Sequence, residues 1–320
     1  MNFKTEVPIE NQFPSITHQS KIALFGSCFV ENIGDKLKYF KFDTYQNPFG
    51  IIFNPIAIQN LFEKMNSGYQ YSAADIFYLN EQYACYDVHS SLNKTEEQEY
   101  LEHLNILLSD VSNYLKTATH LVLTLGTAWV YENKENQKVV ANCHKVPQRN
   151  FNKRLLTTHE ISNSLQKISA ILWNWNPSCK VIITVSPVRH LKDGFIENQQ
   201  SKAQLVVGFN KFLKELTAEE CNQIAYFPSY EIMMDELRDY RFYADDMVHP
   251  SGMAINYIWE KFKGAWVNNK TTNLLTEIDA IQKGLNHRPF NENSQSHQKF
   301  LKKLHQKIIK LTDRESSINF

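Results

Sequence analysis

The sequence of 320 residues predicts an α/β protein, in which a doubly wound parallel sheet carries helices on both faces. Short apolar runs rich in β-branched residues alternate with longer segments, and those segments place apolar residues at helical spacing. A hydrophobic content of 42% supplies enough apolar material for a sizeable core. Together these observations favour repeated strand–helix units.

Five apolar runs are the expected strands. They lie at 21–25, 42–45, 121–125, 181–185 and 224–227. Nearly every position in them is apolar, which is typical of strands that are buried on both faces. We therefore expect these runs to pair in parallel, with helices in the connections.

Four stretches between or after these runs carry the apolar stripe of an amphipathic helix. The stripes consist of Phe29, Ile33, Leu37 and Phe40; of Leu101, Leu104, Leu108, Val111 and Leu115; of Ile161, Leu165, Ile168, Leu172 and Trp175; and of Leu205, Phe209, Phe212 and Leu216. Two capping boxes mark expected helix starts, one at Thr95 with Gln98 and one at Thr157 with Glu160.

Two segments break this alternation and predict a small β extension. Residues 76–90 have the pattern of two strands around Asn80-Glu81, and residues 129–141 have that of a hairpin turning at 133–136. We therefore expect a short antiparallel insertion in each segment.

The chain changes character near its end, where a polar stretch at 268–273 precedes two expected helices near 274–285 and 294–312. We therefore predict an α/β domain over 1–268 and a helical extension over 269–320.

The last expected helix is basic on one side and apolar on the other. Its basic residues are Lys299, Lys302, Lys303, Lys307 and Lys310, and its apolar residues are Phe300, Leu304, Ile308 and Leu311. One interpretation is a helix that binds a membrane or an acidic surface. The other is a solvated helix whose apolar stripe packs on the body or on a partner chain, which is the commoner arrangement.

Charge and motifs argue against several classes of function. Lysine plus arginine equals aspartate plus glutamate at 34 each, so no nucleic-acid partner is expected. The five cysteines are scattered without a C-x-x-C pair, which predicts reduced thiols, and no histidines pair at metal-ligand spacing. The histidine spacing gives no reason to expect a metal. With 10 glycines and no phosphate-binding glycine motif, no nucleotide cofactor is expected either.

The sequence also lacks the pattern of a targeting or membrane segment. Its start, MNFKTEVPIENQFPS, has no apolar core of a secretory signal, and no apolar run is long enough to span a bilayer. We therefore expect a soluble, cytoplasmic protein, and the sequence leaves its oligomeric state open.

Two candidate nucleophiles, Ser27 and Cys28, follow the first expected strand and Gly26. A serine between a strand and a helix can attack a carbonyl while nearby N–H groups hold the oxyanion. The alternative is that Ser27 only caps the helix, which is a common role for serine. Cys28 is the better nucleophile when ionised, but its side chain is expected to point into the packing.

A candidate base lies at Asp246 and His249, which are three residues apart and followed by Pro250. A short loop can fold the carboxylate onto Nδ1 of the imidazole and leave Nε2 free to take the serine proton. The alternative is that both residues cap the next helix. Because Ser27 and this pair would lie at the carboxyl ends of parallel strands, we expect them at one edge of the sheet.

A third element at this edge is Gly126-Thr127, which follows the expected strand at 121–125. If the first and third strands are neighbours, Gly126 and Thr127 flank the same crevice as Ser27. The glycine lets the backbone approach a ligand, and the threonine hydroxyl offers a donor.

Four short motifs accompany these residues. They are Gly26-Ser27-Cys28-Phe29, Asn47-Pro48-Phe49-Gly50, Asn142-Cys143-His144-Lys145 and Ser186-Pro187-Val188-Arg189-His190. Their pattern resembles the GSCFA family within the SGNH/GDSL hydrolase superfamily, over roughly residues 1–260, and leaves the final sixty residues outside. The resemblance implies a flavodoxin-like sheet in the order 2-1-3-4-5. It also implies a triad of Ser27 as nucleophile, His249 as base and Asp246 as its orienting partner.

The resemblance further implies three oxyanion donors: the N–H of the serine, a glycine N–H after the second strand and an asparagine after the third. Ser27 and Gly50 match the first two, whereas Thr127 occupies the place of the asparagine. Either the Thr127 hydroxyl donates, or Asn47 substitutes, or the site is a poor hydrolase. The superfamily's aspartate before the serine is also replaced, by Gly26.

Three more residues are candidates for binding substrate. Arg189 and His190 follow the fourth expected strand, so Arg189 can bind a carboxylate or phosphate and His190 can make a second polar contact. The alternative is a solvated loop. His144 lies in the β extension, from which it can reach over the site.

The sequence therefore predicts a serine acyl ester hydrolase or acyltransferase that forms an acyl-Ser27 intermediate without a cofactor. The superfamily implies a small ester as substrate, and an acylated carbohydrate is the first choice. The alternative is a catalytically weak or inactive binding module for a glycan or an ester, which the missing asparagine favours.

Overall fold

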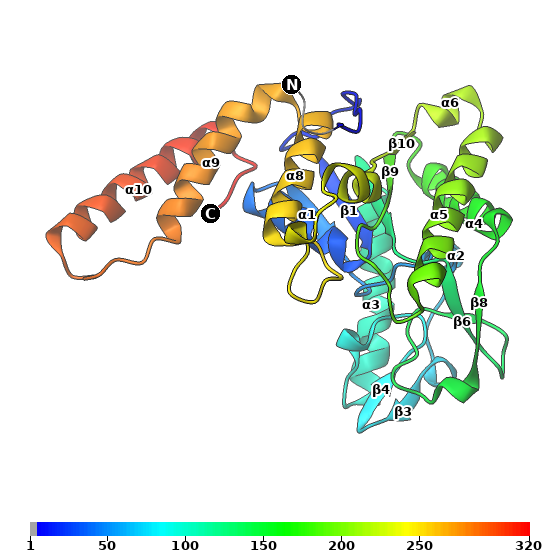
Figure 1. The fold of residues 1–320 in the computed structure, drawn as a ribbon. Helices are drawn as coiled ribbons and strands as arrows, with labels where there is room; N and C mark the ends of the chain where they lie inside the picture. The colour runs from blue at the N-terminus through cyan, green and yellow to red at the C-terminus, as the bar shows by residue number, and fades with distance from the viewer. Residues whose placement is uncertain (1–4) are drawn as a thin grey trace.

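The computed structural model describes residues 5–320 and centres on a five-stranded sheet in the order β10-β9-β5-β1-β2 (Figure 1). The strands are β1 (Lys21–Gly26), β2 (Asp43–Gln46), β5 (His120–Leu125), β9 (Lys180–Val185) and β10 (Ile224–Tyr226). All neighbouring pairs are parallel. Numbered along the chain this is 2-1-3-4-5, so the predicted order is confirmed and is consistent with a flavodoxin-like sheet. The first four residues, which belong to the predicted domain and to the start that lacks the pattern of a secretory signal, lie outside the described residues.

Helices cover both faces of this sheet, as predicted. One face carries α2 (Pro55–Ser67), α3 (Glu97–Leu115), α4 (Thr158–Trp175) and α5 (Phe195–Glu215); the other carries α1 (Cys28–Tyr39) and α8 (Gly252–Trp266). Alternation along β1 explains the division, because Ala23 and Phe25 belong to the first core while Ile22 and Leu24 belong to the second.

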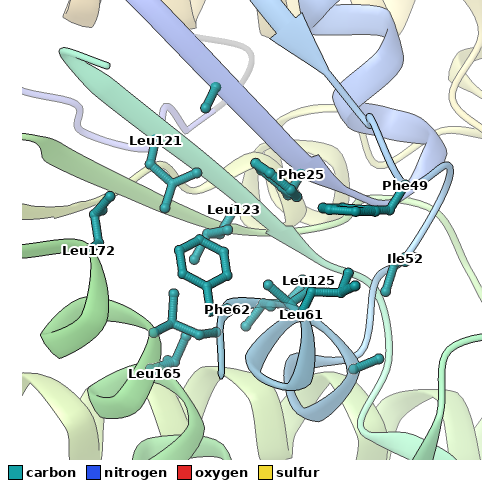
Figure 2. Packing of buried hydrophobic residues seen from close by; sticks show 14 of the residues in the cluster. Phe25, Phe49, Ile52, Leu61, Phe62, Leu121, Leu123, Leu125, Leu165 and Leu172 are labelled. Atoms are coloured by element: carbon teal, nitrogen blue, oxygen red, sulfur yellow. The ribbon is translucent and has the colours of Figure 1, made fainter. Parts of the chain in front are cut away.

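The first core is formed by the apolar stripes of its helices. Figure 2 shows Phe62 of α2 and Leu165 of α4 among the leucines of β5. The capping box predicted for α4 is confirmed, because Thr157 Oγ1 accepts from the N–H of Glu160 at 3.2 Å while the Glu160 carboxylate accepts from the N–H of Thr157 at 2.8 Å.

The capping box predicted at Thr95 is wrong. Helix α3 begins at Glu97, and Glu96 is its N-cap without a side-chain hydrogen bond. Lys94 forms a backbone bridge with Tyr83, which holds the chain extended just before Thr95 and delays the start of the helix.

The β extension is larger than predicted. Strands β3 (Phe77–Leu79) and β4 (Gln82–Ala84) form the first hairpin, and β6 (Trp129–Asn133), β7 (Val139–Val140) and β8 (Phe151–Leu155) form a second sheet in the order β7-β6-β8. Both hairpins were predicted, whereas β8 was missed because Asn152, Lys153 and Arg154 interrupt its apolar pattern. Strands β3, β4, β6 and β8 lie together at the lower end of the body in Figure 1.

The C-terminal extension consists of α9 (Thr272–Leu285) and α10 (Gln295–Arg314), which project from the body as a helical pair (Figure 1). Leu304 and Leu311 of α10 are buried in a small core with Ile278 and Ile281 of α9. The apolar stripe of the basic helix therefore packs on a neighbouring helix, as the second interpretation expects. No helix within residues 5–320 is long and apolar enough to cross a membrane.

Short elements complete the chain. The remaining α-helices are α6 (Ala218–Cys221) and α7 (Ser229–Glu231), and the short 3₁₀ or π turns are Ala73–Asp75, Ser90–Leu92, Gln148–Asn150, Ile232–Glu236, Tyr240–Phe242 and Asn269–Thr271.

Candidate active site

Ser27 lies at the junction of β1 and α1, and its side chain is almost fully buried, with the residue 1% exposed. Its Oγ caps α1 by accepting from the N–H of Phe29 at 3.2 Å. Gly26 precedes it with φ +140°, and a Cβ atom there would lie 2.2 Å from the carbonyl oxygen of Thr124. Only glycine fits this close approach of β1 to β5, so the turn that presents Ser27 is set by backbone packing.

The hydroxyl of Ser27 also donates to Oγ of Ser186 at 3.0 Å. Ser186 directly follows β9, and its own N–H donates to the carbonyl of Leu125 at 2.8 Å. Ser27 is therefore both a helix cap and a member of a buried hydroxyl pair at the carboxyl edge of the sheet. The sequence did not indicate that these two serines pair.

Asp246 and His249 form the predicted pair. One carboxylate oxygen of Asp246 accepts from the N–H groups of Val248 and His249, each at 2.9 Å, and the other lies 2.6 Å from Nδ1 of His249. These hydrogen bonds lower the pKa of Asp246 to about 2, so the carboxylate accepts and Nδ1 donates. The turn leaves Nε2 of His249 without a hydrogen-bond partner within the described residues.

Ser27 and the Asp246–His249 pair line one cavity of about 930 Å³ at the carboxyl edge of the sheet. Its lining includes Ser27, Cys28, Asn54, Thr127, Arg189, His190, Asp246 and His249. Ser27 and His249 form no hydrogen bond with each other among residues 5–320, since the serine hydroxyl faces Ser186. The His249 side chain is 47% exposed, so the base stands at the open side of the cavity.

Arg189 and His190 also line this cavity. The guanidinium of Arg189 donates to the carbonyl of Met247 and lies 4.7 Å from the centre of the Tyr243 ring. The backbone N–H of Arg189 donates to the carbonyl of Val248. Arg189 therefore ties the turn that carries the base to the loop after β9.

The ring of His190 lies 5.1 Å from that of Phe53, and its backbone N–H donates to Oδ1 of Asn198 at 2.9 Å. Burial lowers the pKa of His190 to about 3, with Lys202 and His249 adding to the shift. The imidazole is therefore neutral at neutral pH and can offer a polar contact without charge.

Four predicted site residues do not line the cavity. His144 is buried in the β extension, where its Nε2 contacts the carbonyls of Cys85 and Val88 at 2.7 and 3.1 Å. Asn47, Gly50 and Gly126 are also absent from the lining of the cavity. Oδ1 of Asn47 accepts from the N–H of Gly26 at 2.9 Å, so Asn47 stabilises the turn under the serine.

The three predicted oxyanion donors already have partners within the fold. The N–H of Ser27 donates to the carbonyl of Thr124 at 3.1 Å, and that of Gly50 donates to the carbonyl of Asn47 at 2.8 Å. The hydroxyl of Thr127 pairs with that of Ser201 at 2.9 Å. The N–H groups of Ser27 and Gly50 would each have to exchange this bond before they could hold an oxyanion.

Asn54 is a cavity residue that the sequence did not single out. It is the N-cap of α2: its Oδ1 accepts from the N–H of Ala57 at 2.8 Å, and Pro55 is the first residue of the helix. This bond fixes the amide, and Nδ2 is left without a partner among the described residues. Asn54-Pro55 signals a helix start in the sequence, but nothing local shows that its NH₂ group reaches the cavity.

Cys28, the rival nucleophile, lines the same cavity. Burial, reinforced by Glu31, raises the pKa of its thiol above the usual value, although a helix N-terminus by itself lowers a thiol pKa. The thiol form therefore dominates at neutral pH, which weakens Cys28 as a nucleophile. Within residues 5–320 no group of three or more histidine, cysteine, aspartate and glutamate side chains is placed to hold a metal.

The fold and this edge define the class of protein: a parallel α/β protein whose sheet carries a serine and an aspartate–histidine pair at one cavity. The GSCFA family model matches residues 21–262, so the chain belongs to the GSCFA family. A second model, described as the C-terminal domain of GSCFA domain proteins, matches residues 278–320. The expectation that the final sixty residues lie outside the family is therefore wrong. No curated protein matches the sequence.

Two solved structures show a distant likeness. One is a carbohydrate esterase family 3 from Talaromyces cellulolyticus, at 10% identity and a TM-score of 0.36, covering 81% of this chain and 99% of that one. The other is a mutant acetyl esterase with an acetate ion, at 10% identity and a TM-score of 0.37, covering 81% of this chain and 100% of that one. With TM-scores this low, neither carries an argument about the function of this chain.

Proposed function

We propose that the protein is a serine acyl ester hydrolase or acyltransferase of the SGNH type that acts through an acyl-Ser27 intermediate. The observation that carries this proposal is that Ser27 and a hydrogen-bonded Asp246–His249 pair line one cavity. A nucleophile, a base and an orienting carboxylate at one site are the components of acyl transfer by serine.

The reaction begins when Oγ of Ser27 attacks the ester carbonyl carbon and Nε2 of His249 takes the hydroxyl proton. The tetrahedral intermediate then expels the alcohol, which receives that proton, and Ser27 is left acylated. Water or a second hydroxyl attacks the acyl group and loses its proton to His249, which passes it to Oγ of Ser27 as the bond between Oγ and the acyl carbon breaks. The first acceptor gives hydrolysis, and the second gives transfer.

A rotation of Ser27 is the first requirement of this reaction, because its hydroxyl bonds to Ser186 in the structure. Staggered rotamers of serine are close in energy, and the exchanged bond is a single neutral hydrogen bond. His249 stands on an exposed turn, so approach of substrate can bring the base and the rotated hydroxyl into contact. Catalytic hydrogen bonds are often formed only in the complex with substrate.

The amide of Asn54 is our choice for the oxyanion donor in place of the missing asparagine. Its Nδ2 lacks a partner among the described residues, its residue lines the cavity, and its orientation is fixed by the cap of α2. The helix N-terminus behind it also favours negative charge.

The lining of the cavity favours a small ester with both apolar and polar parts, such as an acylated carbohydrate. Phe53, Trp129 and Val188 provide apolar surface, whereas Asn142 and Asp193 provide hydrogen-bonding groups. Aromatic faces and fixed polar groups are typical of pockets for small ligands.

A binding module for a glycan or ester is the second candidate function. The engaged Ser27 hydroxyl and the engaged N–H groups of Ser27 and Gly50 favour it, because a protein that only binds has no need to free them. In this case the cavity would hold the ligand without turnover.

A fluorophosphonate probe separates the two functions. We expect the probe to label Ser27, as located by mass spectrometry, and labelling to disappear in Ser27→Ala and His249→Ala. Ser67→Ala, at an exposed serine at the end of α2, is the matched control and should label normally. Label on Cys28 would overturn the choice of nucleophile. A folded protein that binds an acylated sugar but takes no label would be a binding module.

A further inference from the structure

Lys202 is a buried lysine of α5 that the proposed reaction does not yet use. It is 1% exposed, and its Nζ donates to the carbonyls of Gly126 and Ser186 at 2.8 and 2.7 Å. It forms no ion pair with a carboxylate within the described residues. The ammonium is therefore buried with backbone oxygens as partners and no countercharge from that part of the chain.

The two carbonyls belong to the loops that build the site. Gly126 follows β5 and precedes Thr127, whereas Ser186 follows β9 and shares a hydrogen bond with Ser27. Lys202 thus joins the ends of two neighbouring strands directly behind the candidate nucleophile.

Two other side chains on the same face of α5 hold the same edge. Ser201 contacts the hydroxyl of Thr127 at 2.9 Å and accepts from the N–H of Ala128 at 2.7 Å, and Asn198 accepts from the N–H of His190. Residues 198, 201 and 202 are spaced for one face of a helix. Helix α5 therefore acts as a polar support for the two loops that follow β5 and β9 at the cavity.

Neutral side chains could make such a support, so the charge of Lys202 needs a separate explanation. Burying an ammonium without a carboxylate is unfavourable, and a methionine would fill similar space without that cost. Burial lowers the pKa of Lys202 to about 7. The other titratable groups near it are Cys28 and His190, whose pKa values it shifts downward, and Tyr230, whose ring lies 5.6 Å from Nζ.

We propose that Lys202 is a positioning residue of the site: it fixes the loops after β5 and β9, and its positive charge stabilises the oxyanion formed on Ser27. The proposal rests on the acyl-Ser27 function. Preorganised positive charge in a water-poor site acts strongly on charge that develops during reaction. The charge of Lys202 would also explain how the site can lack the superfamily's oxyanion asparagine, whose place Thr127 occupies.

The test compares Lys202→Met with Lys180→Met. Lys180 is a matched control because it is also buried, 4% exposed, and its Nζ donates to a backbone carbonyl, that of Asn222 at 2.7 Å. It begins β9, at the opposite edge of the sheet from the cavity. Both variants are expected to lower the melting temperature, so stability alone does not separate them.

Two readouts separate the roles of these lysines. The first is the rate at which the fluorophosphonate labels Ser27, which should fall at least about tenfold in Lys202→Met and stay unchanged in Lys180→Met. The second needs no enzymatic activity: the pKa of the His190 imidazole, followed by NMR of its ring at acidic pH, where Lys202 is fully protonated. Loss of the charge should raise the pKa of His190 in Lys202→Met only.

The outcomes are distinct. If Lys202→Met matches Lys180→Met in both readouts, or slows labelling without moving the pKa of His190, the electrostatic role is refuted. If wild-type protein takes no label but the pKa of His190 rises in Lys202→Met, the acyl-Ser27 function fails while the charge of Lys202 at the cavity is established. If Lys202→Met does not fold, Lys202→Gln, which keeps a donor without charge, replaces it with the same expectations.

Discussion

Ser27 and His249 line the same cavity but are held in place in different ways. The serine is 1% exposed and is fixed by a close approach of two buried strands. The side chains of Asp246 and His249 are 50% and 47% exposed and are fixed by hydrogen bonds within one turn. Packing of the core therefore positions the nucleophile, whereas local chemistry positions the base.

This difference has a consequence for the reaction. Ser27 and the Asp246–His249 pair are each held in place, but the hydrogen bond between Ser27 and His249 is not formed, because the serine hydroxyl donates to Ser186. Variants that damage the pair, or that release the bond to Ser186, therefore test whether Ser27 and the pair act together.

The largest effect is expected when the Asp246–His249 pair is broken at Asp246. In Asp246→Asn, the side-chain oxygen can still accept from the two N–H groups of the turn, but the NH₂ group faces Nδ1 of His249 and favours the wrong tautomer. The labelling rate of Ser27 should fall about 10⁴-fold. Asp245→Asn, at the exposed neighbouring carboxylate, should label at the wild-type rate. Equal rates in all three proteins would disprove the triad.

The low pKa of Asp246 adds a pH dependence to this prediction. Its folded-state value of about 2 lies below the usual value of 3.8, so the carboxylate is ionised throughout the range above about pH 4. The Asp246–His249 pairing should be complete above that pH and be lost only as the pH falls toward 2. NMR of the His249 ring across this range can follow the pairing directly.

An intermediate effect is expected at Asn54. Asn54→Asp keeps an oxygen to cap α2 but removes the NH₂ donor, so the labelling rate should fall about 10²-fold with little change in stability. Asn54→Ala should show the same loss of rate and also lose about 1 kcal/mol of stability with the cap. If Asn54→Asp labels normally, another group must hold the oxyanion.

The smallest effect is expected at Ser186. Ser186→Ala removes one neutral hydrogen bond from Ser27, worth about 1 kcal/mol, and frees the hydroxyl to turn toward His249. Labelling should therefore become faster, by up to about fivefold. A rate that instead falls about tenfold or more would mean that Ser186 is needed to place the nucleophile.

Local patterns were sufficient for most of the framework. Apolar runs located the five central strands, and the three-residue spacing of Asp246 and His249 located a turn that its own hydrogen bonds close. Strand β8 was missed because three polar residues at 152–154 hide it, and the helix start at Thr95 was misplaced because a contact with Tyr83 decides it.

The sequence by itself determined the features that depend on neighbours along the chain: strands, helix caps, the aspartate–histidine turn and the serine at a strand end. Only the tertiary structure decided which groups meet, such as Ser27 with Ser186, which lie 159 residues apart. It also decided that Asn54 and Lys202 lie at the cavity or behind it while His144 is buried elsewhere. The physical reason is that periodicity and turns act over a few residues, whereas parallel pairing brings together loops that are far apart in the chain.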